Sequence, residues 1–411
     1  MAESGPVGSA WAPGGPVSVA PTGSGTLDGV RVVIKDLYDV TGTRTVAGTP
    51  ARLSAEVATR SATVVERLLA AGADVVGKTA TDELAMGMFG ANTHFGTPLN
   101  AAAADRMPGG STSGSATLVA AGEAELGIGT DTGGSIRVPT SFQGLVGLRP
   151  THGRIPLDGV VPMAPAFDTC GLLGRDVAIV ATAFAVLARG VGAALGDGPG
   201  PRSAATLTRL VLLTDLVEQA TDEVAALTRR TAERWARTWG LDLVEERLVE
   251  DPSADLVSVF WPLMSRQLWL ANGAWVRAER PVLGEGIEER ILAAADVTDD
   301  QVAAAAARRD ALVARLGTLL DGAVAVLPTT IDAAPPRTLP HSDLMAWRDR
   351  NLALVVPASL AGVPQLTVPA GRIAHPRTGT SAPVGVSLLG LAGDDELLLR
   401  LAAALTAGEQ A

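Results

Sequence analysis

The chain has 411 residues, of which 47% are hydrophobic and 19% are charged, so it can close a sizeable core as one large domain or two ordinary ones. Its formal net charge of -11 repels phosphate backbones, and its basic residues are scattered, which argues against nucleic-acid binding. No segment offers the roughly 18 uncharged apolar residues that a membrane span requires. We therefore expect no nucleic-acid partner and no membrane partner.

Cysteine and histidine are too sparse to build a metal centre. Cys170 is the single cysteine, which excludes an internal disulfide and a cysteine-based zinc site and suits a reducing cytoplasm. The four histidines lie far apart and show no ligand spacing. We therefore expect a cytoplasmic protein with no metal and no cofactor.

Residues 1–25 are rich in Gly, Pro, Ser and Ala and lack the basic start and apolar core of a secretory signal, so we expect a loose N-terminal tail. Residues 26–411 are expected to fold as a single domain. Within it, we interpret the Gly- and Pro-rich segment 190–203 as a surface loop and residues 204–320 as a largely helical region.

After the tail, short Val/Ile/Leu runs alternate with longer amphipathic segments, which is typical of strands covered by helices in a layered α/β domain. In chain order, strands are expected at residues 30–34, 73–77, 126–129, 145–148, 210–213, 323–327, 365–368 and 384–389. Helices are expected at residues 61–72, 81–86, 113–121, 176–188, 218–239, 300–320 and 394–405. Five of the seven tryptophans lie within residues 235–275, which we interpret as core or lid packing rather than a cofactor site.

Lysine is rare in this chain. Lys35, at the end of the apolar run 30–34, and Lys78 are the only two lysines among 33 basic residues. A buried lysine can lose its proton and act as a neutral base, which arginine cannot do. A retained lysine therefore indicates amine chemistry, although chance in an arginine-rich chain explains the count alone equally well.

Two Gly- and Ser-rich segments, residues 108–116 and 129–139, follow Lys35 along the chain. One such segment alone is compatible with a linker, a phosphate cradle or a turn. The phosphate loop G-x-x-x-x-G-K-[ST] and the hydrolase elbow G-x-S-x-G are absent, and no motif pairs a histidine with a serine. Together with the lysine, the clustered hydroxyl groups indicate a serine nucleophile that is activated by lysine.

These residues resemble the amidase signature family of serine hydrolases. The similarity is carried by Lys35, the two Gly- and Ser-rich segments and the runs 29–36, 77–79, 95–98, 147–153, 327–329, 361–364, 368–371 and 383–386. It weakens between about residues 189 and 320, which marks 204–320 as a variable region. The run 159–171 and the short length most resemble the compact amidases of the indole-3-acetamide hydrolase type. The resemblance implies an α/β fold in α/β/α layers, with a large mixed, mostly parallel twisted β-sheet covered by helices on both faces.

The resemblance also implies the catalytic residues, which would be Lys35, Ser111 and Ser135. Ser135 would be the nucleophile, Ser111 would relay its proton to a neutral Lys35, and the peptide bond between Gly110 and Ser111 would be cis. The backbone N–H groups of a four-residue run would form the oxyanion hole: Thr132, Gly133, Gly134 and Ser135.

Three residues fall in the segment that often lines the acyl pocket of this family: Ala85, Met86 and Met88. Ordinary helix packing explains these three residues equally well. Asp131 and Arg137 flank Ser135 and are implied to brace its loop. Val138 is apolar where relatives that bind acidic substrates carry arginine, which argues against recognition of a second carboxylate.

We therefore expect an amidase that hydrolyses a neutral carboxamide, aryl-substituted or aliphatic, to a carboxylate and ammonia or an amine through an acyl-enzyme on Ser135. Three alternatives stay open: hydrolysis of a carbamate or urea-type bond, the glutamine-hydrolysing amidase subunit of a tRNA-dependent amidotransferase, and a catalytically silent binding protein on the same fold. The expected partner is a small-molecule amide substrate, and a homodimer is compatible with such a fold.

Overall fold

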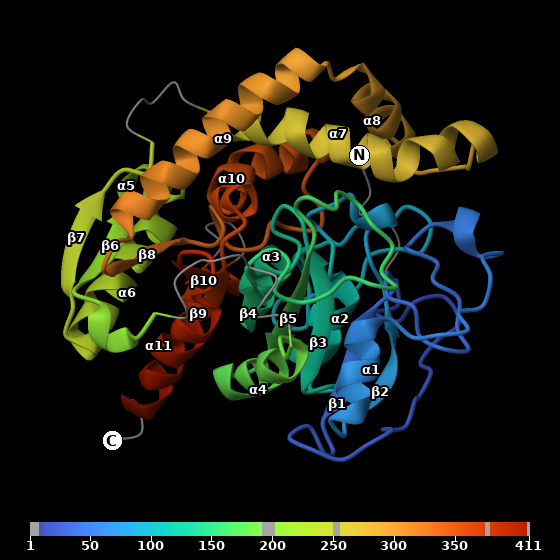
Figure 1. The fold of residues 1–411 in the computed structure, drawn as a ribbon, viewed down its shortest axis with the longest axis horizontal. Helices are drawn as coiled ribbons and strands as arrows, with labels where there is room; N and C mark the ends of the chain where they lie inside the picture. The colour runs from blue at the N-terminus through green and yellow to red at the C-terminus, as the bar shows by residue number, and fades with distance from the viewer. Residues whose placement is uncertain (1–7, 191–201, 250–254, 375–378, 409–411) are drawn as a thin grey trace.

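A ten-stranded sheet organises the described residues of the computed structural model, which are 8–190, 202–249, 255–374 and 379–408 (Figure 1). In chain order the strands are β1 (Arg31–Lys35), β2 (Asp74–Thr79), β3 (Leu126–Asp131), β4 (Val146–Arg149), β5 (Thr169–Gly174), β6 (Arg209–Leu213), β7 (Asp242–Glu246), β8 (Ala323–Pro328), β9 (Gln365–Ala374) and β10 (Ser381–Leu389). Their order across the sheet is β2-β1-β3-β5-β4-β9-β10-β8-β6-β7. Strands from both halves of the chain therefore share one sheet.

The strands pair in both directions. Parallel pairs lie at the two ends of the sheet, where β1 joins β2 and β3 and where β6 joins β7 and β8. All pairs from β3 across the centre to β8 are antiparallel. Only residues 375–380 separate β9 from β10, which is too short for the crossover that a parallel pair requires. The expected mixed sheet is confirmed, whereas the expectation of mostly parallel pairing is wrong for its centre.

Helices cover both faces of the sheet, as expected. One face carries α1 (Thr63–Ala70), α4 (Val177–Leu187), α6 (Asp222–Trp239) and α11 (Asp395–Gly408), and the other carries α2 (Ser113–Ala120) and α3 (Arg137–Gln143). Alternation along β1 separates the two faces, because Val33 packs in the cluster of α2 while Val32 and Ile34 belong to the larger cluster that holds the buried face of α1.

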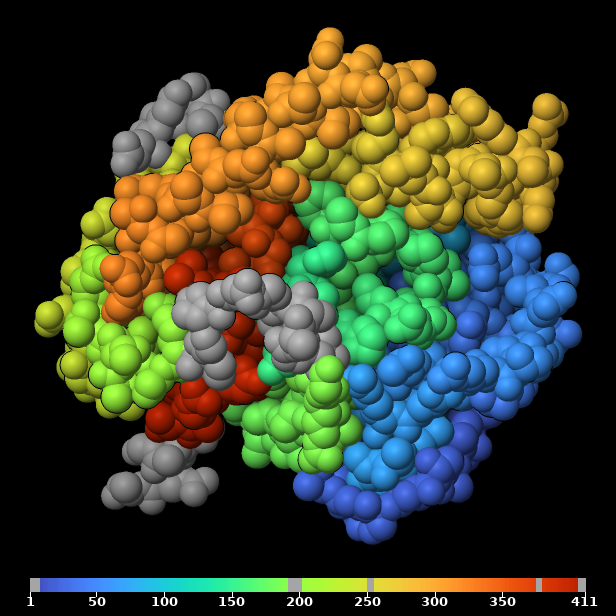
Figure 2. Space-filling model, in the orientation of Figure 1, coloured from blue at the N-terminus to red at the C-terminus, as the bar shows by residue number. Residues whose placement is uncertain are grey.

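Four further helices pack against one another and form what we call the helical cap: α7 (Leu256–Glu279), α8 (Ile287–Ala293), α9 (Asp299–Leu319) and α10 (His341–Ala361). Figure 1 shows α7, α8 and α9 as an arc along the top of the molecule, and Figure 2 shows the yellow and orange atoms of this arc resting on the rest of the protein. The cap is tied to the sheet domain where Arg137 Nη1 donates a hydrogen bond to the carbonyl of Val355 in α10.

The remaining helical pieces are short. They are α5 (Thr214–Val217) and the 3-10 turns η1 (Pro50–Arg52), η2 (Glu83–Ala85), η4 (Ala204–Thr206) and η5 (Ala294–Asp296). Among the helices of the described residues, none combines the length and the apolar character needed to span a bilayer.

Most elements lie within a few residues of their expected positions, but no individual element was expected at α3, β5, β7, α7, α8 or α10. Of these, α7 and α8 fall in the region 204–320 that was expected to be largely helical. The segment expected as a helix at residues 81–86 is instead the turn η2. Leu84 and Ala85 there have φ angles of +49° and +60°. Residues with positive φ angles adopt a left-handed backbone conformation, which a right-handed helix cannot accommodate, so this segment does not continue as an α-helix.

We expected a loose tail, but its described part, residues 8–25, lies along β2. Trp11 and Val19 form bridges with the strand, and Val19 N donates to the carbonyl of Val75 at 2.7 Å. Because β2 is an edge strand, its outer N–H and C=O groups need partners, and the tail supplies them. The other tail residues, 1–7, and residues 191–201 of the expected surface loop lie outside the described residues.

Candidate active site

The candidate site is built around Lys35, the last residue of β1, whose side chain is fully buried. Side chains alternate along a strand, so Lys35 projects from the same face as Val33, toward α2. Ser111 lies just before α2, and Lys35 Nζ is 2.7 Å from Ser111 Oγ and 2.9 Å from Thr130 Oγ1. Two hydroxyl groups therefore hold the amine, which forms no ion pair within the described part of the chain.

The environment of Lys35 favours a neutral amine. Burial lowers the pKa of Lys35 from 10.5 to about 7, although the charges of Asp82, Asp131 and Asp168 act to raise it. When the amine is protonated, Nζ donates to Ser111 Oγ; when it is neutral, the Ser111 hydroxyl can donate to Nζ. The hydrogen bond between Lys35 and Ser111 can therefore persist in either protonation state of the amine.

The other lysine is a useful contrast, because Lys78 is also buried but has an acidic partner. Its Nζ lies 2.7 Å from Asp36 Oδ1 and also donates to the carbonyl of Arg44 and to Thr45 Oγ1, each at 2.9 Å. A buried ammonium group with a carboxylate and two further acceptors is electrostatically satisfied. Lys78 therefore ties β2 to the segment around Thr45, whereas Lys35 has no carboxylate in contact among the described residues.

The chain before Ser111 passes very close to a buried acid, Asp82. The Gly110–Ser111 peptide bond is cis, as the resemblance implied, and a Cβ atom at Gly110 would lie 2.5 Å from Asp82 Oδ1. Asp82 Oδ2 accepts from the N–H of Gly90 at 3.2 Å, while Oδ1 has no hydrogen-bond partner among the described residues. Only glycine fits at position 110.

Asp82 and Lys35 are a buried acid and base whose charges affect each other's pKa. Burial raises the pKa of Asp82, and the charge of Lys35 lowers it. Burial thus drives both groups toward their neutral forms, while their mutual attraction favours the charged pair. Sequence analysis did not select Asp82, because an acid after Thr81 resembles an ordinary residue of a first helical turn.

Ser135 lies in the turn between β3 and α3, beside Ser111. Its carbonyl accepts a hydrogen bond from Thr112 N at 3.3 Å, which joins the two serine-bearing segments. Ser135 also lines a cavity and keeps 7% of its surface exposed, whereas Ser111 is fully buried. No hydrogen bond joins the side chains of Ser111 and Ser135 in the part of the chain that the structure describes.

The backbone N–H groups around Ser135 are not equivalent. Gly134 N donates to Asp131 Oδ1 at 2.9 Å, so this expected oxyanion-hole donor is occupied. The N–H groups of Thr132, Gly133 and Ser135 have no acceptor within the described residues. These three donors, rather than four, are available to a ligand in the cavity.

A buried ion network fixes this turn. Asp131 accepts from Arg137 Nε at 2.9 Å and Nη2 at 2.7 Å, and from Arg149 Nη1 at 3.1 Å. Burial alone would raise the pKa of Asp131, but the two guanidinium groups overcome it and hold this pKa well below its usual range. Asp131 is therefore a permanent anion that anchors the Ser135 turn, in agreement with the bracing that the resemblance implies.

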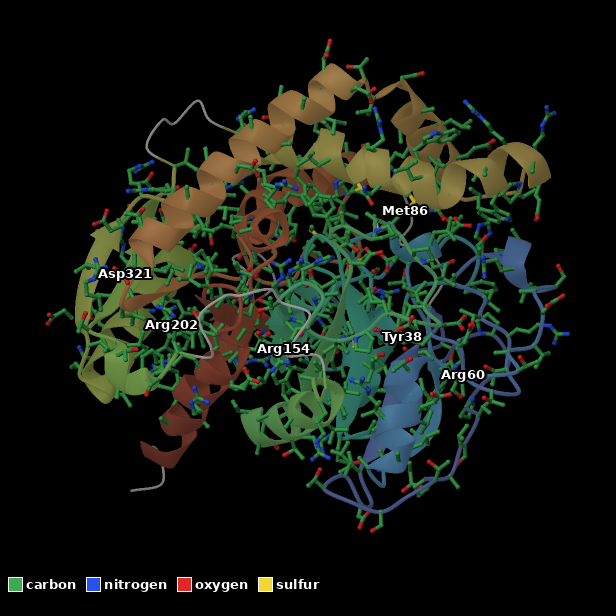
Figure 3. All side chains as sticks on the ribbon, viewed as in Figure 1. Tyr38, Arg60, Met86, Arg154, Arg202 and Asp321 are labelled. Carbon is green, nitrogen blue, oxygen red and sulfur yellow. The ribbon has the colours of Figure 1, made fainter. Side chains whose placement is uncertain are left out.

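An apolar cavity of about 240 Å³ opens beside Ser135. One wall comes from the turn after β3 and from the η2 segment, and it includes all three expected pocket residues, Ala85, Met86 and Met88. Figure 3 labels Met86 directly beneath the helical cap. Lys35 and Ser111 do not line this cavity, so Ser135 is the member of the expected catalytic set that a ligand would meet first.

The opposite wall belongs to the helical cap. Phe260, Trp261 and Met264 of α7 face the cavity, and Arg290 of α8 and Arg348 of α10 complete this side. The sequence did not predict this wall. The resemblance is weak around Phe260, Trp261, Met264 and Arg290, and Arg348 lies outside the motifs that carry it. The tryptophan cluster was the one available signal: Trp261, which was interpreted as core or lid packing, lines the cavity.

An α/β/α fold that buries a lysine–serine pair next to a second, cavity-lining serine defines the class of the amidase signature hydrolases. The Amidase family model matches residues 16–209 and 267–399, and the chain belongs to this family.

Some relatives match nearly the whole chain, and others match less than half of it. Amidase 1 of Arabidopsis thaliana is 33% identical over 95% of this chain and 96% of its own length. One subunit of the glutamyl-tRNA(Gln) amidotransferase of Symbiobacterium thermophilum is 49% identical, but over only 164 residues, which are 40% of this chain and 33% of that protein. Among solved structures, a crystal structure of an amidase is 30% identical, covers 93% of this chain and 85% of its own, and superposes with a TM-score of 0.81.

The ion network around Asp131 makes a prediction about stability. Arg137→Met should lower the free energy of unfolding by about 3 kcal/mol, because it leaves the buried Asp131 with Arg149 as its only cationic partner. Urea denaturation at pH 7 measures this change. Arg60→Met is the control, since the Arg60–Glu66 pair is exposed and should contribute less than about 1 kcal/mol. Equal effects of the two variants would contradict the bracing role.

Proposed function

We propose that this protein is an amidase that hydrolyses a carboxamide to a carboxylate and ammonia or an amine, through an acyl-enzyme on Ser135. The observation that carries the proposal is the 2.7 Å contact between buried Lys35 Nζ and Ser111 Oγ, next to the serine that lines the cavity. Membership of the Amidase family supports amide hydrolysis as the reaction.

In the proposed acylation step, Ser135 Oγ attacks the carbonyl carbon of the substrate. Ser111 accepts the proton of Ser135 and passes its own to the neutral amine of Lys35. Ser135 must turn toward Ser111 for this transfer, and catalytic hydrogen bonds often tighten in this way when substrate binds. The lowered pKa of Lys35 supports its role as the base.

The tetrahedral intermediate carries a negative charge on the former carbonyl oxygen. The free N–H groups of Thr132, Gly133 and Ser135 are suited to stabilise it. As the C–N bond breaks, Lys35 returns the proton through Ser111 to the departing nitrogen, which leaves as ammonia or an amine. Water then attacks the acyl-enzyme, the same relay accepts and returns its proton, and the carboxylate is released from Ser135.

The walls of the cavity favour an acyl group with an aryl or alkyl part, because methionine and aromatic side chains line it. This agrees with the resemblance to amidases of the indole-3-acetamide hydrolase type. The similarity to the amidotransferase of Symbiobacterium thermophilum covers only 40% of the chain, which makes glutamine hydrolysis the weaker proposal. Carbamates and urea-type bonds follow the same acyl chemistry and belong in the same assay.

The test is release of ammonia or amine from indole-3-acetamide, benzamide, short aliphatic amides, an anilide, a carbamate and glutamine. Hydrolysis of aryl or aliphatic amides should disappear in Ser135→Ala, and a fluorophosphonate probe should label the wild-type protein but not this variant. Activity restricted to glutamine would favour the amidotransferase alternative. A folded wild-type protein that neither reacts with the probe nor hydrolyses any amide would be a binding protein.

Substitution of Lys35 tests the base. Lys35→Arg and Lys35→Ala should both lower kcat by about 10²–10⁴-fold, because arginine keeps its proton and cannot accept another. In the wild-type protein, kcat/KM should fall as the pH drops below the pKa of Lys35, near 7, since protonation removes the base. Lys78→Arg is the matched control for the residue type, and its activity should be largely retained. Substantial turnover by Lys35→Arg would show that the base is a different group.

Asp82→Asn tests the coupling of this acid to Lys35. The charge of Asp82 raises the pKa of Lys35, so its removal should lower that pKa and move the acidic limb of the kcat/KM profile to lower pH, by about 0.5 unit or more. Asp395→Asn is a control with a buried carboxyl group that hydrogen-bonds Thr151 instead. If the limb stays in place in a folded Asp82→Asn protein, Asp82 does not influence the base.

A further inference from the structure

The charged side chains that line the cavity beside Ser135 are all positive. Arg290 and Arg348 line it, and its lining residues include no aspartate or glutamate. The chain as a whole is acidic, with 44 acidic and 33 basic residues. The cavity therefore carries positive charge, although the net charge of the protein is negative.

The two guanidinium groups are held in place by different contacts. Arg290 Nε donates to the carbonyl of Gly286 at 2.9 Å, which anchors the side chain to the start of α8. Arg348 forms an ion pair with the exposed Asp349, to whose Oδ1 it donates from Nε and Nη2 at 3.0 and 2.8 Å. Its Cζ lies 5.8 Å from the ring centre of Trp261. Both arginines are thus positioned before any ligand arrives.

Arg290 is not neutralised by its surroundings. Its two terminal nitrogens form no hydrogen bond and no ion pair in the part of the chain that the structure describes. Burial and the charge of Arg348 lower the pKa of Arg290, while Asp82 and Glu289 act in the opposite direction from beyond contact distance. A desolvated cation near a like charge gains much from an anion that reaches both.

The apolar side chain of Val138 does not argue against an anionic ligand in this cavity. Its apolar side chain led to the expectation that a second carboxylate is not recognised. In the structure Val138 is fully buried behind Gly134 and does not line the cavity. The charge of the cavity is set instead by Arg290 and Arg348 of the helical cap.

We propose that Arg290 and Arg348 bind an anionic group at the end of the substrate remote from the scissile bond, so that the preferred substrates are amides in which an apolar chain or ring carries a carboxylate. This inference rests on the proposed amidase function. The terminal nitrogens of Arg290 and Nη1 of Arg348 suit the purpose, because they are not used by the contacts described above and guanidinium N–H groups form strong hydrogen bonds with carboxylate oxygens. The apolar walls between Ser135 and the arginines would hold the intervening chain or ring.

Binding to the Ser135→Ala protein tests the inference without turnover. Calorimetry would compare 4-(carbamoylmethyl)benzoate with its neutral counterpart 2-(4-methylphenyl)acetamide. We expect the anionic amide to bind at least about 10-fold more tightly, the gain typical of a hydrogen bond to a charged group. Adding Arg290→Gln and Arg348→Gln should remove this preference. Adding Arg309→Gln, in the exposed part of the cap, should leave it intact.

Two further variants guard against a folding defect. Arg290→Lys and Arg348→Lys keep the positive charge and should retain part of the preference, with urea denaturation as the check on folding. Equal affinity of the two amides for Ser135→Ala, or a preference that survives in the double Gln variant, would overturn the inference. Hydrolysis of neutral amides by the wild-type protein would in that case still support the proposed function, so the two failures are distinguishable.

Discussion

The candidate site depends on one electrostatic constraint: the amine of Lys35 is buried, and no carboxylate of the described residues is in contact with it. Transfer of an ammonium group into a protein interior costs several kcal/mol when no counter-ion compensates it. Hydroxyl groups can hydrogen-bond to either protonation state, so Ser111 and Thr130 stabilise the amine without fixing its charge. Lys78, which is equally buried but paired with Asp36, shows the opposite solution in the same fold.

Asp131 is a second buried ionisable group, and unlike Lys35 it is held in its charged form. Asp131 is surrounded by guanidinium and backbone donors, so its charge is permanent and its position fixed. The Ser135 turn is built on this anchor, and α10 is attached to it through Arg137. The fold therefore combines an ion network that holds geometry with a buried acid and base, Asp82 and Lys35, that burial drives toward their neutral forms.

Local motifs made the centre of the site predictable. Lys35, Ser111 and Ser135 each lie in a short run whose spacing can be compared directly with a family. Asp82 could not be found in this way, since its importance arises from burial against Gly110, 28 positions further along the chain. The centre of the sheet was also misjudged, because strand direction depends on which strands become neighbours. The helical cap was only partly predicted: α7 and α10 each contain an internal proline, which disrupts the helical pattern.

The two walls of the cavity differ in how far the Amidase family model matches their residues. The wall that carries Ser135 and the η2 segment lies inside the part of the chain that matches the Amidase family, while Phe260, Trp261 and Met264 fall in the unmatched interval between residues 209 and 267. The α7 part of the cavity wall thus lies largely in a stretch that the family does not share, whereas Arg290 and Arg348 fall within the matched part of the chain. Substitutions at Phe260, Trp261 or Met264 of α7 would therefore reshape the cavity from the side opposite Ser135, without altering the turn that carries this serine.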